Sequence, residues 1–302
     1  MNSGGSLARL RTFVRSGVKH GITKTIRALG FELKRLEPHQ ERGRKKLQPH
    51  PASVLFASML NFRDIHSVEN EKTLNFIKYC LNNMKHSKAQ LLQDLFVLFT
   101  LDEKVGGYFV EFGAMDGVTL SNTFLLQSRY GWSGIVAEPA RRWHYELKHN
   151  RNCSIDFRCV WKTSGELLEF NETRALEFST INSFTDADCY ARIRVNGHLY
   201  VVETVSLADL LRHYNAPKVV DYLSIDTEGW ELEILNSFVF DDYEIRVITV
   251  EHNHSDRRSR IHDLPTSKGY WRVFDQLSYF DDWYVRTASA QIQTHEIPAQ
   301  MS

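Results

Sequence analysis

The sequence predicts an α/β fold in which helices cover both faces of a parallel β-sheet. From residue 105 onward, short runs rich in β-branched and aromatic residues alternate with amphipathic helical stretches, and this alternation is typical of parallel sheets. Acidic residues and glycines directly follow several of the predicted strands, at the edge where such sheets bind their ligands. Of the 302 residues, 42% are apolar and 25% are charged, which excludes a mostly disordered chain.

The order of elements divides the chain into four segments. Residues 1–50 form a basic amphipathic and linker segment, and residues 51–104 form a helical lead-in because their apolar residues recur at helical spacing. Residues 105–290 form the α/β domain, and residues 291–302 form a tail.

The N-terminal segment differs in charge from the rest of the chain. Residues 1–50 carry 12 Lys and Arg against 3 Asp and Glu, and residues 1–31 contain no acidic residue. Three interpretations remain open: a solvated basic helix, a helix lying on an anionic membrane surface, and a transit peptide. The remaining chain is acidic, which argues against a nucleic-acid partner. No apolar run approaches the roughly 18 residues of a membrane span.

The four cysteines, at positions 80, 153, 159 and 189, show neither a CxxC pair nor a zinc-ligand spacing. We therefore expect reduced thiols and a cytoplasmic protein, with peripheral membrane contact only through the N-terminal segment. A disulfide between Cys153 and Cys159 is the less favoured alternative.

The predicted strands are short and mostly apolar, and a helical stretch follows most of them. The interval 161–219 is too long for one connection, so we expect an extra strand or hairpin near residues 177–204. A β-hairpin over residues 269–285 is expected to close one edge of the sheet. The other predicted strands span residues 108–114, 133–139, 155–161, 219–226 and 245–253.

The loop after the first strand favours a cationic ligand over a phosphate. Its glycines have the spacing G-x-x-x-G, whereas a dinucleotide-binding loop has GxGxxG. S-adenosylmethionine carries an amino group and a sulfonium without a phosphate, so it fits; an ordinary strand-to-helix turn is the alternative. The candidate cofactor-binding residues of this loop are Glu111, Gly113, Ala114, Asp116, Gly117, Ser121 and Asn122.

The second strand ends in Glu138 and Pro139, which are the other candidate cofactor-binding residues. An acidic residue at this place can accept hydrogen bonds from both ribose hydroxyls of a nucleoside. NAD and S-adenosylmethionine share this feature, so the preceding loop decides between them.

Polar side chains also follow the fourth and fifth of these strands. Asp226 and Glu228 come after one, and Glu251, His252 and Asn253 end the other. We expect these groups to converge at one edge of the sheet, where buried charge is costly unless it is solvated, paired or functional. The alternative is a hydrogen-bonded set that braces the loops.

Several sequence blocks resemble the FkbM-type family of class I S-adenosylmethionine-dependent methyltransferases. The resemblance spans about residues 87–285, and it places Met115 where class I members generally carry a glycine. It implies a Rossmann-like, seven-stranded, mostly parallel sheet with an antiparallel last strand, preceded by N-terminal helices. The blocks are SKAQLLQDLFVL, YFVEFGAMDGVTLSNT, GWSGIVAEPA, NRNC, VSLADLL, VVDYLSIDTEGWELEIL and VITVEHN.

The resemblance implies methyl transfer from S-adenosylmethionine to a hydroxyl of a sugar, glycolipid, polysaccharide or related natural product. The candidates for the base that takes the hydroxyl proton are Glu228 and His252. Histidine titrates nearest neutrality, which favours His252 for this role. Asp226 is expected to orient the cofactor or the acceptor. The chain lacks the (Asp/Asn/Ser)-Pro-Pro-aromatic motif that nucleic-acid amino-methyltransferases carry, so base methylation is not expected.

Similarity to catechol O-methyltransferase-like enzymes raises a Mg²⁺ site as a further hypothesis. Asp226, Glu251 and Asn253 stand near the places where those enzymes hold the ion, and oxygen ligands suit Mg²⁺. The alternative is that these groups hydrogen-bond one another and the acceptor.

Two other functions remain open from the sequence. One is a non-catalytic protein that binds S-adenosylmethionine, and the other is a nicotinamide oxidoreductase, which the missing GxGxxG disfavours. In each enzymatic case the expected partner is a small-molecule or glycan acceptor.

Overall fold

The computed structural model describes residues 71–173, 179–184, 194 and 197–286. The predicted basic segment 1–50, the start of the helical lead-in and the 291–302 tail lie outside the described residues, as does the membrane-surface helix. The described part belongs to one compact unit, Val68–Ser302.

The main sheet has seven strands, of which six run parallel and one runs antiparallel. Its order is β10-β11-β9-β8-β1-β2-β3, and β11 is antiparallel to both of its neighbours. The predicted seven-stranded sheet and the C-terminal hairpin are therefore confirmed. The strands are β1 Tyr108–Phe112, β2 Ser133–Ala137, β3 Ser154–Asp156, β8 Val219–Ile225, β9 Glu244–Glu251, β10 Tyr270–Val273 and β11 Asp281–Arg286.

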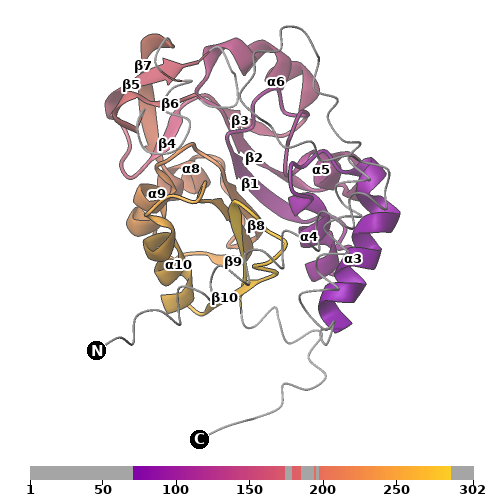
Figure 1. Cartoon of the computed structure of the whole chain (residues 1–302). Helices are drawn as coiled ribbons and strands as arrows, with labels where there is room; N and C mark the ends of the chain where they lie inside the picture. The colour runs from indigo at the N-terminus through magenta and orange to yellow at the C-terminus, as the bar shows by residue number, and fades with distance from the viewer. Residues whose placement is uncertain (1–70, 174–178, 185–193, 195–196, 287–302) are drawn as a thin grey trace, which may run out of the picture. The chain divides into compact units, whose positions relative to one another are not determined.

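Helices cover both faces of this sheet, as Figure 1 shows for α8, α9 and α10 on one side and α3, α4 and α5 on the other. Each side has its own cluster of buried apolar side chains. The α-helices are α3 Glu71–Asn83, α4 Gln93–Thr100, α5 Phe124–Tyr130, α6 His144–Asn150, α8 Leu207–His213, α9 Glu231–Ser237 and α10 Arg258–Ser267. The 3-10 helices are η1 Met84–His86, η2 Arg141–Trp143 and η4 Asn182–Phe184.

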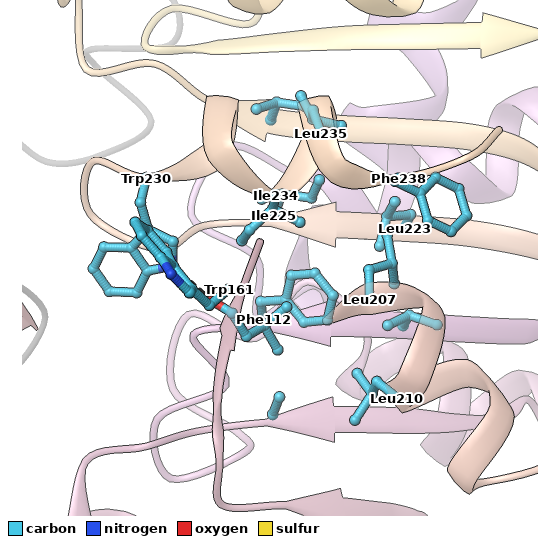
Figure 2. Packing of buried hydrophobic residues seen from close by; sticks show 14 of the residues in the cluster. Phe112, Trp161, Leu207, Leu210, Leu223, Ile225, Trp230, Ile234, Leu235 and Phe238 are labelled. Carbon is cyan, nitrogen blue, oxygen red and sulfur yellow. Dashed lines mark hydrogen bonds between the residues drawn. The ribbon is translucent and has the colours of Figure 1, made fainter. Parts of the chain in front are cut away.

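Apolar packing fixes the central strands in the middle of the sheet. Figure 2 shows strand residues Leu223 and Ile225 facing the side chains of α8 and α9, among them Leu207 and Ile234. Strands β1, β8 and β9 are almost wholly buried, as expected for strands covered on both faces. Their carboxyl ends therefore open at one rigid edge.

A second sheet of four strands lies between β3 and α8 in the sequence, in the order β4-β7-β5-β6. Its strands β6 and β7 lie where extra strands were predicted, near residues 177–204, whereas β5 lies wholly before that range. Its strands are β4 Cys159–Trp161, β5 Leu167–Glu172, β6 Thr180–Ile181 and β7 His198–Ser206.

The predicted single strand over residues 155–161 is wrong, because β3 and β4 belong to different sheets. Asp156 breaks the run: its carboxylate accepts the backbone N–H of Arg158 at 2.8 Å and forms a turn. The chain then joins the second sheet, and the indole N–H of Trp230 donates to the Val160 carbonyl at 2.9 Å. The sequence of this run does not show that its two halves pair with different sheets.

The structure also tests the expectations about the cysteines and about membrane-spanning helices. Cys80, Cys153 and Cys159 are free, so the alternative disulfide is wrong. Among the described helices, no helix is long and apolar enough to cross a membrane.

Candidate functional site

A pocket opens at the carboxyl ends of β1, β2, β8 and β9. Its space, including the open mouth, is about 1020 Å³. Of the residues predicted for the site, it is lined by Gly113, Glu138, Pro139, Asp226, Glu228, Glu251 and Asn253. The other lining residues are Gln90, Phe112, Met115, Leu120, Ala137, Val160, Phe170, Ser179, Thr227, Trp230 and Phe280.

Gly113 allows the β1 loop to lie directly against the end of β8. Its φ is +75°, and a Cβ added there would lie 2.1 Å from the backbone oxygen of Asp226. Met115 has a φ of 49°, in the left-handed region, and its N–H donates to Glu138 Oε2 at 2.9 Å. The loop thus ties the ends of three neighbouring strands together.

Glu138 is 5% exposed and is positioned by backbone donors. Oε1 accepts the N–H of Ala140 at 2.8 Å, and Oε2 accepts the N–H of Met115. Burial raises the pKa of Glu138 to about 7, although both backbone hydrogen bonds act in the opposite direction. Each carboxylate oxygen can accept more than one hydrogen bond, so Glu138 can still receive donors from a ligand in the pocket.

Glu111 is occupied by partners within the protein and is not among the pocket-lining residues. Its carboxylate accepts the N–H of Asn122 at 2.6 Å and the hydroxyls of Ser121 and Thr123 at 3.0 and 2.5 Å. Arg151, with a fully buried side chain, donates to it at 3.3 Å. The acid that the sequence placed on the cofactor is therefore part of a buried network that shapes the loop.

The rest of the predicted loop residues lie around this network and outside the pocket lining. Asp116 accepts the N–H groups of Val118 and Thr119 at 2.8 and 2.7 Å. Gly117 (φ +82°) lies against Arg151, whose Cγ would be 2.5 Å from an added Cβ. Its freedom serves a close approach within the protein. Two other predicted loop residues are buried: Ala114 packs into one core cluster, and Asn122 donates to Ser224 Oγ at 2.9 Å.

Three carboxylates meet at the ends of β8 and β9. One oxygen each of Asp226, Glu228 and Glu251 lies within 4.8 Å of the others. Burial raises the pKa of Asp226 to about 7, and burial together with the neighbouring Asp226 raises the pKa of Glu251 well above its usual value. Among the described residues, Glu251 Oε2 is buried without a hydrogen-bond partner. These three acidic side chains thus form one cluster at the pocket.

Glu228 is fixed by residues of the second sheet and its connection. Arg194 Nη2 donates to Glu228 Oε2 at 2.8 Å, and the Thr180 hydroxyl donates to the Glu228 carbonyl at 2.9 Å. Glu228 itself has a φ of 59°, which is a strained conformation for this residue type. The second sheet thus completes one wall of the site.

His252 is not among the residues that line this pocket. Its Nδ1 accepts the N–H of His254 at 3.0 Å, and its Nε2 lies 3.8 Å from Asp282 Oδ1. Burial lowers its pKa to about 4. Glu251, the last residue of β9, and Asn253 line the pocket, whereas His252 between them does not.

Reasoning from the sequence missed several residues of the site. Arg151 and Arg194 are buried partners of predicted acids, and nothing in their local sequence marks them. The sequence indicates such arginines only indirectly, because a buried acid requires a partner somewhere in the chain. The aromatic rings of Phe112, Phe170 and Phe280 also line the pocket.

Comparisons with known proteins give a family match. The Methyltransferase FkbM domain matches residues 111–284, which is more than half of the chain. A comparison with curated proteins found no match. Among solved structures, a chain of the fibrillarin/Nop5p complex is similar, with 11% sequence identity and a TM-score of 0.28. That match covers 59% of this chain and 70% of the other, and at this TM-score it carries no argument.

Proposed function

This chain belongs to the FkbM methyltransferase domain family, and we propose that it transfers a methyl group from S-adenosylmethionine to a hydroxyl. The proposed acceptor is a sugar, glycolipid, polysaccharide or related natural product. The observation that carries the proposal is a single pocket that joins Glu138, at the end of β2, to the carboxylates that follow β8 and β9.

The pocket residues fit S-adenosylmethionine. Glu138 is held by two backbone N–H groups and keeps acceptor capacity for ribose hydroxyls. Apolar side chains such as Ala137 and Val160 line the pocket near it, which suits an adenine ring. The carboxylates at the end of β8 and β9 suit the amino and sulfonium groups, whereas they would repel the phosphates of a dinucleotide.

When bound, S-adenosylmethionine supplies a methyl group on a sulfur that is already an activated leaving group. The protein then has two tasks, which are to align the acceptor oxygen and to accept its proton. We assign the alignment to Asp226 and the proton acceptance to Glu228, since both line the pocket and Arg194 holds Glu228 in place. His252, which does not line the pocket, has no direct role in this scheme.

The first test measures cofactor binding by isothermal titration calorimetry. Glu138→Ala should weaken S-adenosylmethionine binding by about 1.5–3 kcal/mol, or roughly 10- to 150-fold, through the loss of charge-assisted hydrogen bonds. Glu203→Ala, at an exposed position on β7, is the matched control and should bind normally.

Unchanged affinity in a folded Glu138→Ala variant would overturn the assignment of this residue. Titration with NAD tests the alternative that the protein is a nicotinamide oxidoreductase. Tighter binding of NAD than of S-adenosylmethionine would contradict the proposed function. The acceptor class is tested with labelled S-adenosylmethionine and extracts of cell-envelope glycans and lipids, followed by mass spectrometry of the methylated product. Cofactor binding without transfer to any fraction would favour the non-catalytic alternative.

We also propose that the basic amphipathic segment 1–31 brings the protein to an anionic membrane, where lipid-linked acceptors are found. The charge of +9 over residues 1–50 supports this, because each Lys or Arg near such a surface contributes about 1 kcal/mol. Co-sedimentation of the full chain with anionic vesicles should exceed that with neutral vesicles and should fall at high salt. Equal pelleting of the full chain and a chain without residues 1–50 would contradict the proposal.

A further inference from the structure

The carboxylates that follow β8 and β9 have a feature that methyl transfer alone does not explain. Three acidic side chains converge, and among the described residues neither Asp226 nor Glu251 takes part in an ion pair. Glu228 is the member that is paired, with Arg194. We propose that Asp226, Glu228 and Glu251 together bind a divalent cation of the Mg²⁺ type.

The unpartnered oxygen of Glu251 is the observation that distinguishes this cluster from an ordinary acidic surface. Glu251 is 7% exposed, lines the pocket, and its Oε2 has no hydrogen-bond partner among the described residues. A buried oxygen without a donor destabilises the folded state, and more so when it is charged. A cation in the pocket would remove that cost, because it would give the oxygen a direct ligand bond.

The spacing of the three carboxylates suits a small hard cation. Mg²⁺ binds oxygens at about 2.0–2.1 Å in an octahedron, so two ligand oxygens lie roughly 3–4 Å apart. The carboxylate oxygens here lie within 4.8 Å of one another, so small side-chain rotations would bring them to the ion. Mg²⁺ usually keeps several waters, and the open mouth of the pocket leaves room for them.

This ligand set differs from the one expected from the sequence. Glu228 takes the place of Asn253 as third ligand, since the left-handed turn after Thr227 brings its carboxylate to the other two. Asn253 still lines the same pocket. Three carboxylates from two adjacent strands also give a hard, all-oxygen donor set, which favours Mg²⁺ or Mn²⁺ over zinc.

The role of the cation rests on the proposed function, whereas its binding does not. A hydroxyl bound to the cation would have a lowered pKa, so that its proton could leave to solvent through a neighbouring carboxylate. Its oxygen would form the bond to the methyl carbon as the carbon–sulfur bond breaks. The cation site would then select acceptors whose hydroxyl can reach this edge of the sheet.

The test is direct binding of Mn²⁺ to the full chain after treatment with EDTA and dialysis. Electron paramagnetic resonance counts free Mn²⁺, and calorimetry with Mg²⁺ gives the affinity of the native ion. We expect one saturable site per chain, weakened at least about tenfold by Glu251→Gln or Asp226→Asn. Glu244→Gln, at the opposite end of β9 in an exposed pair with Arg246, is the matched control and should bind normally.

Thermal unfolding provides a second readout on the same proteins. Saturating Mg²⁺ should raise the melting temperature of the native chain and of Glu244→Gln, because a ligand that binds only the folded state stabilises it. It should not raise that of Glu251→Gln. If Glu251→Gln fails to fold, Asp226→Asn decides the question alone.

Absence of saturable Mn²⁺ binding would overturn the proposal, as would equal affinity in Asp226→Asn and the native chain. Titration of S-adenosylmethionine in excess EDTA keeps the two proposals apart. Cofactor binding without Mn²⁺ binding overturns only the cation site, whereas Mn²⁺ binding without cofactor binding overturns only the proposed function.

Discussion

Carboxylates at the end of β1 and at the ends of β8 and β9 stand at the same edge of one sheet but have opposite surroundings. Glu111 accepts four hydrogen bonds from within the protein, one of them from the buried Arg151. Asp226 and Glu251 lie instead beside each other and beside further acids. The residue type and its place at a strand end therefore do not decide its role, whereas the supply of donors does.

The local sequence explains where the donors go. After β1, the helix start supplies a backbone N–H and two hydroxyls to Glu111. After β8, the N–H groups of Thr227 and Gly229 are also available, but both donate to Glu231 at 3.2 and 2.9 Å. Asp226 receives neither of these N–H groups and lines the pocket. Glu111 therefore holds the loop after β1 together, whereas the acid after β8 is available to a ligand.

The largest effect should follow from breaking the closed network. Glu111→Gln leaves Arg151 without its carboxylate and turns an amide group toward donors that cannot accept it, such as the N–H of Asn122. Removing one partner of a buried ion pair costs about 3–5 kcal/mol. Urea unfolding monitored by circular dichroism should show a loss of this size.

Glu244→Gln removes a partly exposed carboxylate and should cost less than about 1 kcal/mol. An equally small loss in Glu111→Gln would mean that the network does not stabilise the β1 loop, and the contrast between the two regions would fail.

The opposite sign is expected for a buried acid that lies close to other acids. Asp281 pairs in register with Glu251, is 4% exposed, and its pKa is raised to about 8 by burial and by Asp226. An unfolded aspartate ionises near pH 4, so between about pH 4 and 8 the native state holds a proton that the unfolded state has lost. This contribution is fully present below that window, and stability is lost as the pH rises through it.

Asp281→Asn should remove that loss, since its amide oxygen can still accept the hydrogen bond of Gln93. The free energy of unfolding of the variant, relative to the native chain, should rise by on the order of 3 kcal/mol from about pH 5 to pH 8. Denaturant unfolding at several pH values in EDTA measures it. Asp275→Asn, at an exposed position, serves as control, and a pH-independent difference for Asp281→Asn would contradict the raised pKa.

The strands and the edge at which they open could be predicted from the sequence, because central strands such as Val219–Ile225 are short, mostly apolar runs. The place of Glu138 could be predicted for the same reason, since it directly follows such a run. The division of residues 155–161 between two sheets could not, because pairing of β4 with β7 depends on contacts with residues more than 40 positions away.

The role of each acid could not be predicted without knowing which basic residue pairs with it. Glu111 and Arg151 are 40 residues apart, and Glu228 and Arg194 are 34 apart. Neither arginine belongs to a periodic pattern, so a reading of one strand and its loop shows an acid without its counter-ion. The orientation of His252 follows its contacts with His254 and Asp282, which the local sequence pattern does not show.

The smallest effect is expected at His252, which the sequence proposed as a base together with Glu228. Its ring faces Asp282 and the N–H of His254, and its lowered pKa of about 4 makes it a weak proton acceptor. His252→Asn keeps an acceptor for the His254 N–H, so methyl incorporation from labelled S-adenosylmethionine should fall by less than about threefold. Loss of a general base costs roughly 10²- to 10⁴-fold, which is the effect we expect of Glu228→Gln in the same assay. A 10²- to 10⁴-fold fall in methyl incorporation by a folded His252→Asn variant would contradict this prediction. It would mean that His252 acts as the base and that the pocket rearranges when the acceptor binds.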